Sequence, residues 1–105
     1  MTKYVLFYKD GTVPATAQEM TTLMQAWQTW VDGLGAIVFD PGNPFGPATT
    51  LTATSTVSNG GSSAIKGYMI FTAANLVAAT ALAQDCPHRT INGGTIEVYE
   101  TLPIG

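Results

Sequence analysis

The sequence predicts a small α+β domain in which two helices pack on an antiparallel sheet. Three observations lead to this expectation. Runs of β-branched and aromatic residues recur along the chain, two segments repeat apolar residues at helical spacing, and clusters of Gly, Pro and Asn separate these segments. The 105 residues are the usual size of one domain, so we expect residues 1–105 to form a single domain.

The first strand and the first helix carry the clearest signals. Residues 4–8 (YVLFY) are β-branched, aromatic or apolar and are followed by an Asp-Gly turn, which predicts a strand. Thr16 and Glu19 have the spacing of a capping box, in which each side chain accepts a hydrogen bond from a free backbone N–H. Glycines after the helix predict its C-cap. Its apolar face consists of Met20, Leu23, Met24, Trp27, Trp30, Val31 and Leu34.

The middle of the chain has weaker signals. Residues 36–39 (AIVF) predict a second short strand. Residues 40–47 (DPGNPFGP) contain three prolines and two glycines, so we expect an ordered loop or bend. Residues 49–57 are β-prone but weakly apolar, which suits an edge or hairpin segment. Residues 58–63 (SNGGSS) predict a turn.

The last third of the chain predicts a strand, a helix and a strand. Residues 65–71 (IKGYMIF) form the third strong strand signal, and Asn75 is a good N-cap for a second helix. Pro87 is expected to end that helix, and residues 95–100 (TIEVYE) predict a final strand. The resulting order is the split βαβ, ferredoxin-like arrangement. The apolar face of the second helix consists of Leu76, Ala79, Leu82, Ala83 and Cys86.

The strong strands are apolar on both faces, which predicts a homodimer. In residues 4–8, Val5 and Phe7 point to one face of the sheet while Leu6 and Tyr8 point to the other. Two helices cover only one face of a four-stranded sheet, and the chain has no third layer to offer. A second subunit that brings its own sheet would cover the other face.

Composition excludes several classes of partner. Charged residues make up 10% of the chain and the net charge is −3, so the basic surface that nucleic acids or anionic membranes require is absent. The four cations, Lys3, Lys9, Lys66 and Arg89, are scattered. No segment has the length and apolar character of a signal peptide or a membrane span, and the single cysteine allows no intrachain disulfide. We therefore expect a cytoplasmic protein.

Nearly the whole chain resembles the YCII-related (DGPF) family. The matching stretches are residues 24–30 (MQAWQTW), 40–47, 66–71 (KGYMIF), 85–88 (DCPH) and 93–98 (GGTIEV). The resemblance implies a dimeric α+β barrel, in which two ferredoxin-like sheets pack face to face. In many relatives, a histidine in the first helix and an acidic residue before a proline are proposed as a catalytic pair, and Asp85 matches that acidic residue.

Two positions differ from the family pattern. Residues 62–65 (SSAI) stand where the family carries Asp-Gly-Pro-Phe, and the only histidine, His88, is not in the first helix. His88 titrates near neutrality, so one interpretation is proton transfer by Asp85 and His88. The other is that His88 caps the preceding helix by bonding its last carbonyls. Cys86 falls on an apolar helix face, so we expect a buried structural thiol.

Four further residues are candidates for a ligand site: Trp27, Trp30, Asn43 and Tyr68. The two tryptophans could line a slot between helix and sheet above Tyr68, or simply pack in the core. Asn43 sits in a Gly-Asn-Pro bend that either presents its side chain to the slot or only turns the chain. One Cys and one His cannot complete a zinc site, so we expect no metal and no cofactor.

Two functional classes remain open. The first is a small-ligand-binding, accessory or regulatory dimer. The second is a cofactor-free enzyme of the lyase, isomerase or dehydrohalogenase kind that moves a proton with Asp85 and His88. The absence of a histidine in the first helix favours the binding module.

Overall fold

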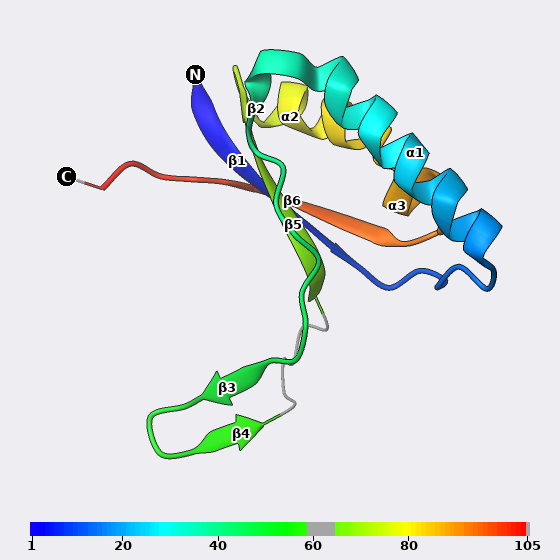
Figure 1. The fold of residues 1–105 in the computed structure, drawn as a ribbon. Helices are drawn as coiled ribbons and strands as arrows, with labels where there is room; N and C mark the ends of the chain where they lie inside the picture. Colours follow the sequence, from blue (N-terminus) through cyan, green and yellow to red (C-terminus); the bar gives the residue numbers. More distant parts are fainter. Residues whose placement is uncertain (59–64, 105) are drawn as a thin grey trace.

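The computed structural model describes residues 1–58 and 65–104. Figure 1 shows one main sheet, helices on one of its faces and a separate hairpin. The elements in chain order are β1 (Thr2–Lys9), α1 (Ala17–Leu34), the 3-10 helix η1 (Gly35–Ile37), β2 (Val38–Asp40), β3 (Thr49–Leu51), β4 (Thr56–Ser58), β5 (Ile65–Ala73), α2 (Leu76–Ala83), α3 (Pro87–Thr90) and β6 (Thr95–Glu100). None of the described helices is both long and apolar enough to cross a bilayer.

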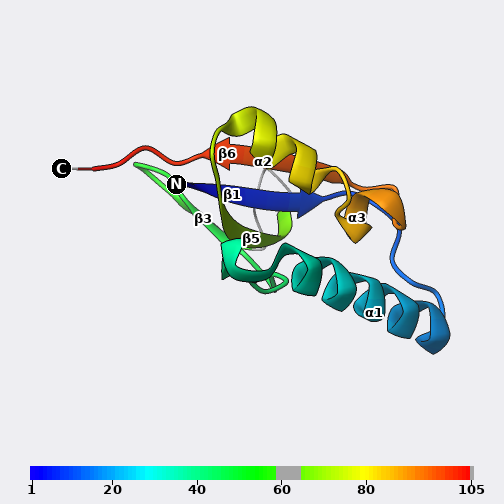
Figure 2. The same cartoon turned by 90° about the horizontal axis from the view of Figure 1, so that it is seen from above.

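The main sheet is antiparallel and has the strand order β2-β5-β1-β6. β1 lies in the centre, and its Leu6 stands opposite Met69 of β5 and Val98 of β6. Figure 2 shows α1 and α2 lying apart over the sheet, with β1 visible between them. The order and the one-sided helix layer confirm the predicted ferredoxin-like fold.

The core lies between the sheet and the helices. Alternate residues of the two central strands are buried there, because successive side chains of a strand point to opposite faces. Burying each large apolar side chain contributes about 1.5–3 kcal/mol to folding. The core cluster consists of Tyr4, Leu6, Met69, Phe71, Ala73, Ala79 and Ala83.

The opposite face of the sheet carries Val5, Phe7, Ile70 and Tyr99, which we call the open face. Val5, Phe7 and Ile70 are half-buried, and Tyr99 is 51% exposed. The rings of Phe7 and Tyr99 pack edge to face, with centroids 5.7 Å apart. All described helices lie on the other side of the sheet (Figure 1), so the apolar open face predicted from the strands is present.

Helix α1 begins with the predicted cap. The Thr16 hydroxyl accepts a hydrogen bond of 3.1 Å from the Glu19 N–H, and the Glu19 carboxylate accepts one of 2.8 Å from the Ala15 N–H. The N–H that bonds the Glu19 carboxylate is therefore that of Ala15, the residue before the N-cap Thr16. Gly35 ends the helix with φ +64°, a backbone conformation that favours glycine.

The strand predicted over residues 36–39 is only partly correct. Ala36 and Ile37 belong to η1, and β2 begins at Val38. The Gly35 N–H bonds the Val31 carbonyl and the Val38 N–H bonds the Gly35 carbonyl, so one further tight turn follows α1 before the chain extends.

The segment over residues 49–57 forms a hairpin, one of its two predicted forms. β3 and β4 pair with each other and not with the main sheet, and Figure 1 shows them projecting away from it. Of the turn predicted over residues 58–63, Ser58 is instead the last residue of β4, and the others lie outside the described residues.

The second predicted helix is shorter than expected. Asn75 caps it as predicted, with the side-chain oxygen 2.8 Å from the Ala78 N–H, but α2 ends at Ala83. Pro87 begins the separate short helix α3, because a proline suits a first helical position, where no N–H is needed. Cys86 and His88 are therefore not at the end of α2. His88 lies inside α3.

Candidate functional site

A groove of about 800 Å³ lies between α1, the loop of residues 41–45 and the end of β1. From α1, it is lined by Met20, Leu23, Met24 and Trp27. Met20 is 41% exposed and Met24 is 63% exposed, whereas the second half of α1 packs on the core through Trp30, Val31 and Leu34. The apolar stripe predicted for α1 therefore serves two purposes: its C-terminal half closes the core and its N-terminal half forms a wall of the groove.

A row of four aromatic rings connects α1, β1 and α3. Trp30 packs on Trp27, Trp27 on Tyr8 and Tyr8 on His88, with ring centroids 5.7, 5.3 and 5.2 Å apart. Trp27, Tyr8 and His88 line the groove, while Trp30 lies behind them against the core. The structure therefore places Trp27 on the groove and Trp30 behind it, against the core.

His88 is buried and held by the backbone of β1. Its side chain is 4% exposed, and its ring Nε2 lies 2.6 Å from the Lys9 carbonyl oxygen. A carbonyl only accepts, so Nε2 carries the proton. A Cβ on Gly94 would overlap the ring, and the Gly94 N–H donates to the His88 carbonyl at 2.9 Å. The capping interpretation is wrong, because the ring bonds a strand carbonyl instead of the last carbonyls of α2.

Asp85 lies apart from this site. It is exposed and does not line the groove. Among the residues that the structure describes, no ion pair joins Asp85 to His88. The ion pair present is between Lys9 and Glu97, at 3.4 Å. The two residues are close in sequence, but α3 directs His88 inward while Asp85 remains on the surface before it.

Tyr8 is a site residue that the sequence analysis missed. Its ring packs over Gly67, where a Cβ would overlap the hydroxyl, and it contributes to the groove. Burial, and secondarily the nearby Cys86, raise the pKa of Tyr8. Tyr8 could have been recognised as a site residue from its pairing with Gly67 across β1 and β5, since a glycine leaves room for the ring. The pairing depends on strand register, which the sequence analysis did not predict.

Asn43 lines the groove, whereas Tyr68 does not. Tyr68 instead supports the loop that carries Asn43. Its hydroxyl donates to Asp40 at 2.9 Å, which is the main reason its pKa is raised, and its ring stacks on Phe45 with centroids 5.6 Å apart. Asp40 also accepts a bond of 2.8 Å from the Gly42 N–H, so the loop is tied to the sheet edge.

Cys86 is fully buried, as predicted from its apolar position. Burial raises the pKa of its thiol to about 11, because a thiolate is poorly solvated there. A thiol in this state is a poor nucleophile at neutral pH.

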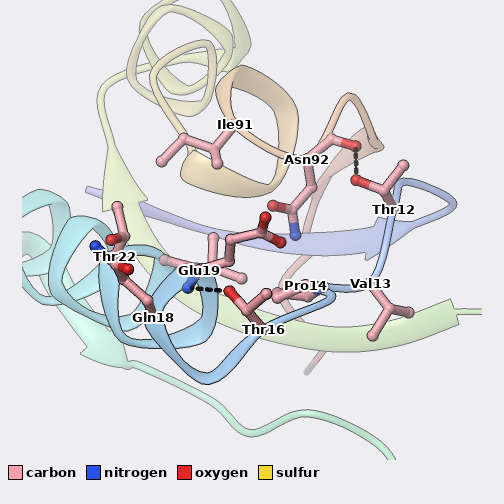
Figure 3. Close-up of a pocket in the computed structure, with 10 residues that line it drawn as sticks. Thr12, Val13, Pro14, Thr16, Gln18, Glu19, Thr22, Ile91 and Asn92 are labelled. Carbon is pink, nitrogen blue, oxygen red and sulfur yellow. Dashed lines mark hydrogen bonds between the residues drawn. The ribbon is translucent and has the colours of Figure 1, made fainter.

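A second groove of about 540 Å³ adjoins the first near the start of α1 (Figure 3). The two share Thr12, Val13, Pro14, Leu23 and Asn92. The Thr12 N–H bonds the Asn92 carbonyl at 3.0 Å, which joins the loop after β1 to the loop after α3. In the described part of the chain, no three His, Cys, Asp or Glu side chains gather as metal ligands would.

Comparison with known proteins gives a fold but no family. No protein-family model and no curated protein matches this chain. Among solved structures, the chain is similar to the 5-chloro-2-hydroxyhydroquinone dehydrochlorinase TftG from Burkholderia phenoliruptrix AC1100, in complex with 2,5-dihydroxybenzoquinone. The TM-score is 0.52, the alignment covers 90% of each chain and the identity is 17%. At this identity the similarity shows that the two proteins share a small α+β fold.

Proposed function

We propose that this chain is a YCII-related, dimeric module that binds a small apolar ligand, in which residues 1–105 form one YCII-like domain. The observation that carries the proposal is the groove of about 800 Å³ with Trp27, Tyr8 and His88 along one side. Small-molecule sites are typically concave, mostly apolar and about 300–1,000 Å³ in volume, with a few polar groups that orient the ligand.

The wall of the groove favours a flat, apolar ligand. Met20 and Met24 are flexible and polarisable, and Trp27 offers the edge and face of a large ring. Exposed methionines on a helix cost free energy unless something covers them. A ligand between α1 and the loop of residues 41–45 would cover Met24, which is 63% exposed in the free chain.

The dimer in this proposal uses the open face. Val5, Phe7, Ile70 and Tyr99 form a continuous apolar surface that a second sheet would cover, as in the dimeric α+β barrel of YCII-related proteins. The groove lies on the helix side of the sheet, so each subunit would keep its own groove accessible.

Binding of two simple probes tests the ligand site. Acetophenone and cumene carry groups of similar size on the same ring, and binding of either should shift the indole N–H resonance of Trp27. Trp27→Leu should weaken the binding of both probes by about tenfold, because the substitution removes the aromatic wall of the groove. Ligand-observed NMR measures this binding. Trp30→Phe is the matched control and should bind as the parent does, since Trp30 packs against the core. If Trp27→Leu binds both probes as tightly as the parent, the proposed site is wrong.

The second candidate is the cofactor-free enzyme that transfers a proton with Asp85 and His88. The position of His88 on the groove favours this candidate. The fold that the chain shares with a dehydrochlorinase is compatible with the candidate. Asp85 would have to act from the exposed position it has before α3. Turnover of a halogenated hydroquinone that is lost in both His88→Gln and Asp85→Asn would support this candidate, and turnover retained in both variants would rule it out.

A further inference from the structure

The four tyrosines of this chain differ in where their hydroxyls point. Tyr4 donates to Glu100 at 3.0 Å, Tyr68 to Asp40 at 2.9 Å and Tyr99 to Glu97 at 3.4 Å. Tyr8 is the exception: within the described residues, no side chain or backbone group hydrogen-bonds its hydroxyl. Three tyrosines are satisfied by carboxylates of their own chain, and the fourth lines the groove.

The surroundings of Tyr8 hold its ring in one place. Trp27 packs on one side with centroids 5.3 Å apart, and His88 packs at 5.2 Å. Gly67 lies under the hydroxyl, where any side chain would displace it. The ring is therefore fixed by neighbours on α1, α3 and β5 while its polar end is left unpaired, an arrangement suited to orienting a ligand.

The neighbouring polar side chain, His88, already has a hydrogen-bond partner. The Nε2–H of His88 is used by the Lys9 carbonyl at 2.6 Å, so it is not available to a ligand. Burial raises the pKa of Tyr8, which keeps its hydroxyl protonated at neutral pH. The hydroxyl is not a buried orphan, since no buried side-chain polar atom of the described residues lacks a partner. Water can accept its hydrogen bond in the free groove, and a ligand oxygen can replace that water.

From this geometry we infer that Tyr8 determines which ligands the groove accepts, by donating a hydrogen bond to an oxygen acceptor on a flat ring that lies against Trp27. The ligand class is an aryl ketone, quinone-like carbonyl or related ring bearing an unprotonated oxygen. This inference rests on the proposed function, and it adds the residue that distinguishes an oxygenated ring from a hydrocarbon of the same shape.

The test uses the same two probes with a variant that removes only the hydroxyl. Acetophenone has a carbonyl oxygen, and cumene replaces it with a methyl group. Tyr8→Phe keeps the ring contacts with Trp27 and His88, and the matched control Tyr99→Phe removes a hydroxyl on the open face. Dissociation constants come from titrating the Trp27 indole N–H resonance, with the full amide spectrum as a check that each variant is folded.

Tyr8→Phe should weaken acetophenone binding relative to the parent by about three- to tenfold, which corresponds to the loss of one hydrogen bond. Cumene binding to Tyr8→Phe, and both probes with Tyr99→Phe, should be unchanged. If acetophenone binds Tyr8→Phe as tightly as the parent, the role of Tyr8 is overturned while the groove remains a ligand site. If neither probe shifts Trp27 in the parent, the proposed function and this inference both fail.

Discussion

His88 and Lys9, which are 79 positions apart in the sequence, are joined by a hydrogen bond of 2.6 Å between the histidine Nε2–H and the lysine carbonyl. The bond ties α3 to the end of the central strand β1. Because β1 also positions Tyr8, the same contact fixes one side of the groove relative to the sheet.

Replacing His88 should therefore destabilise the fold. His88→Ala removes a buried ring and leaves the Lys9 carbonyl without its partner, so the free energy of unfolding should fall by about 2–4 kcal/mol. Urea denaturation followed by tryptophan fluorescence measures the change. Arg89→Ala, at the next and exposed position of α3, is the control and should cost about 1 kcal/mol or less. Equal stability of His88→Ala and the parent would contradict the buried bond.

Stability should fall in alkaline solution because of Cys86. Burial raises the pKa of this thiol from 9.0 to about 11, so between these values the unfolded chain releases a proton that the folded chain keeps. Stability from this group is fully present below pH 9 and is lost as pH rises toward 11. The loss should be roughly 2 kcal/mol across that window.

Comparison with Cys86→Ala isolates this contribution, since the tyrosines of both proteins also ionise in alkali. The difference in unfolding free energy between parent and variant should shrink from pH 8 to pH 11 by roughly 2 kcal/mol. Thiol labelling gives an independent check: the native parent should react only after denaturation. A difference that stays constant with pH would mean that the thiolate is not excluded from the fold.

The open face should mediate dimerisation. Size-exclusion chromatography with light scattering should give twice the chain mass of 11.0 kDa at micromolar concentration. Val5→Lys places a charge between Ile70 and Tyr99 on the open face and should yield a monomer, because burying an unpaired charge costs several kcal/mol. Met24→Lys, on the groove wall instead, should remain dimeric. A monomeric parent would refute the dimer.

Local chemistry made several elements predictable from the sequence. Thr16, Glu19 and Asn75 cap their helices through partners within a few residues, so the spacing alone indicated where α1 and α2 begin. The apolar side chains on both faces of β1 and β5 likewise predicted a sheet with one apolar face that the helices leave uncovered. Where local signals competed, as in the turn of η1 after Gly35 and the helix that Pro87 begins, the predicted boundaries were partly wrong.

The sequence by itself determined the order of strands and helices, the burial of Cys86 and the apolar character of the face that Trp27 occupies, because each depends on neighbours along the chain. Only the tertiary structure decided which side chains share the groove. Tyr8 meets Gly67 through strand register, and His88 reaches Lys9 because α3 turns its ring inward. Both contacts join residues far apart in the chain, and their geometry follows from how the layers pack, which no local pattern specifies.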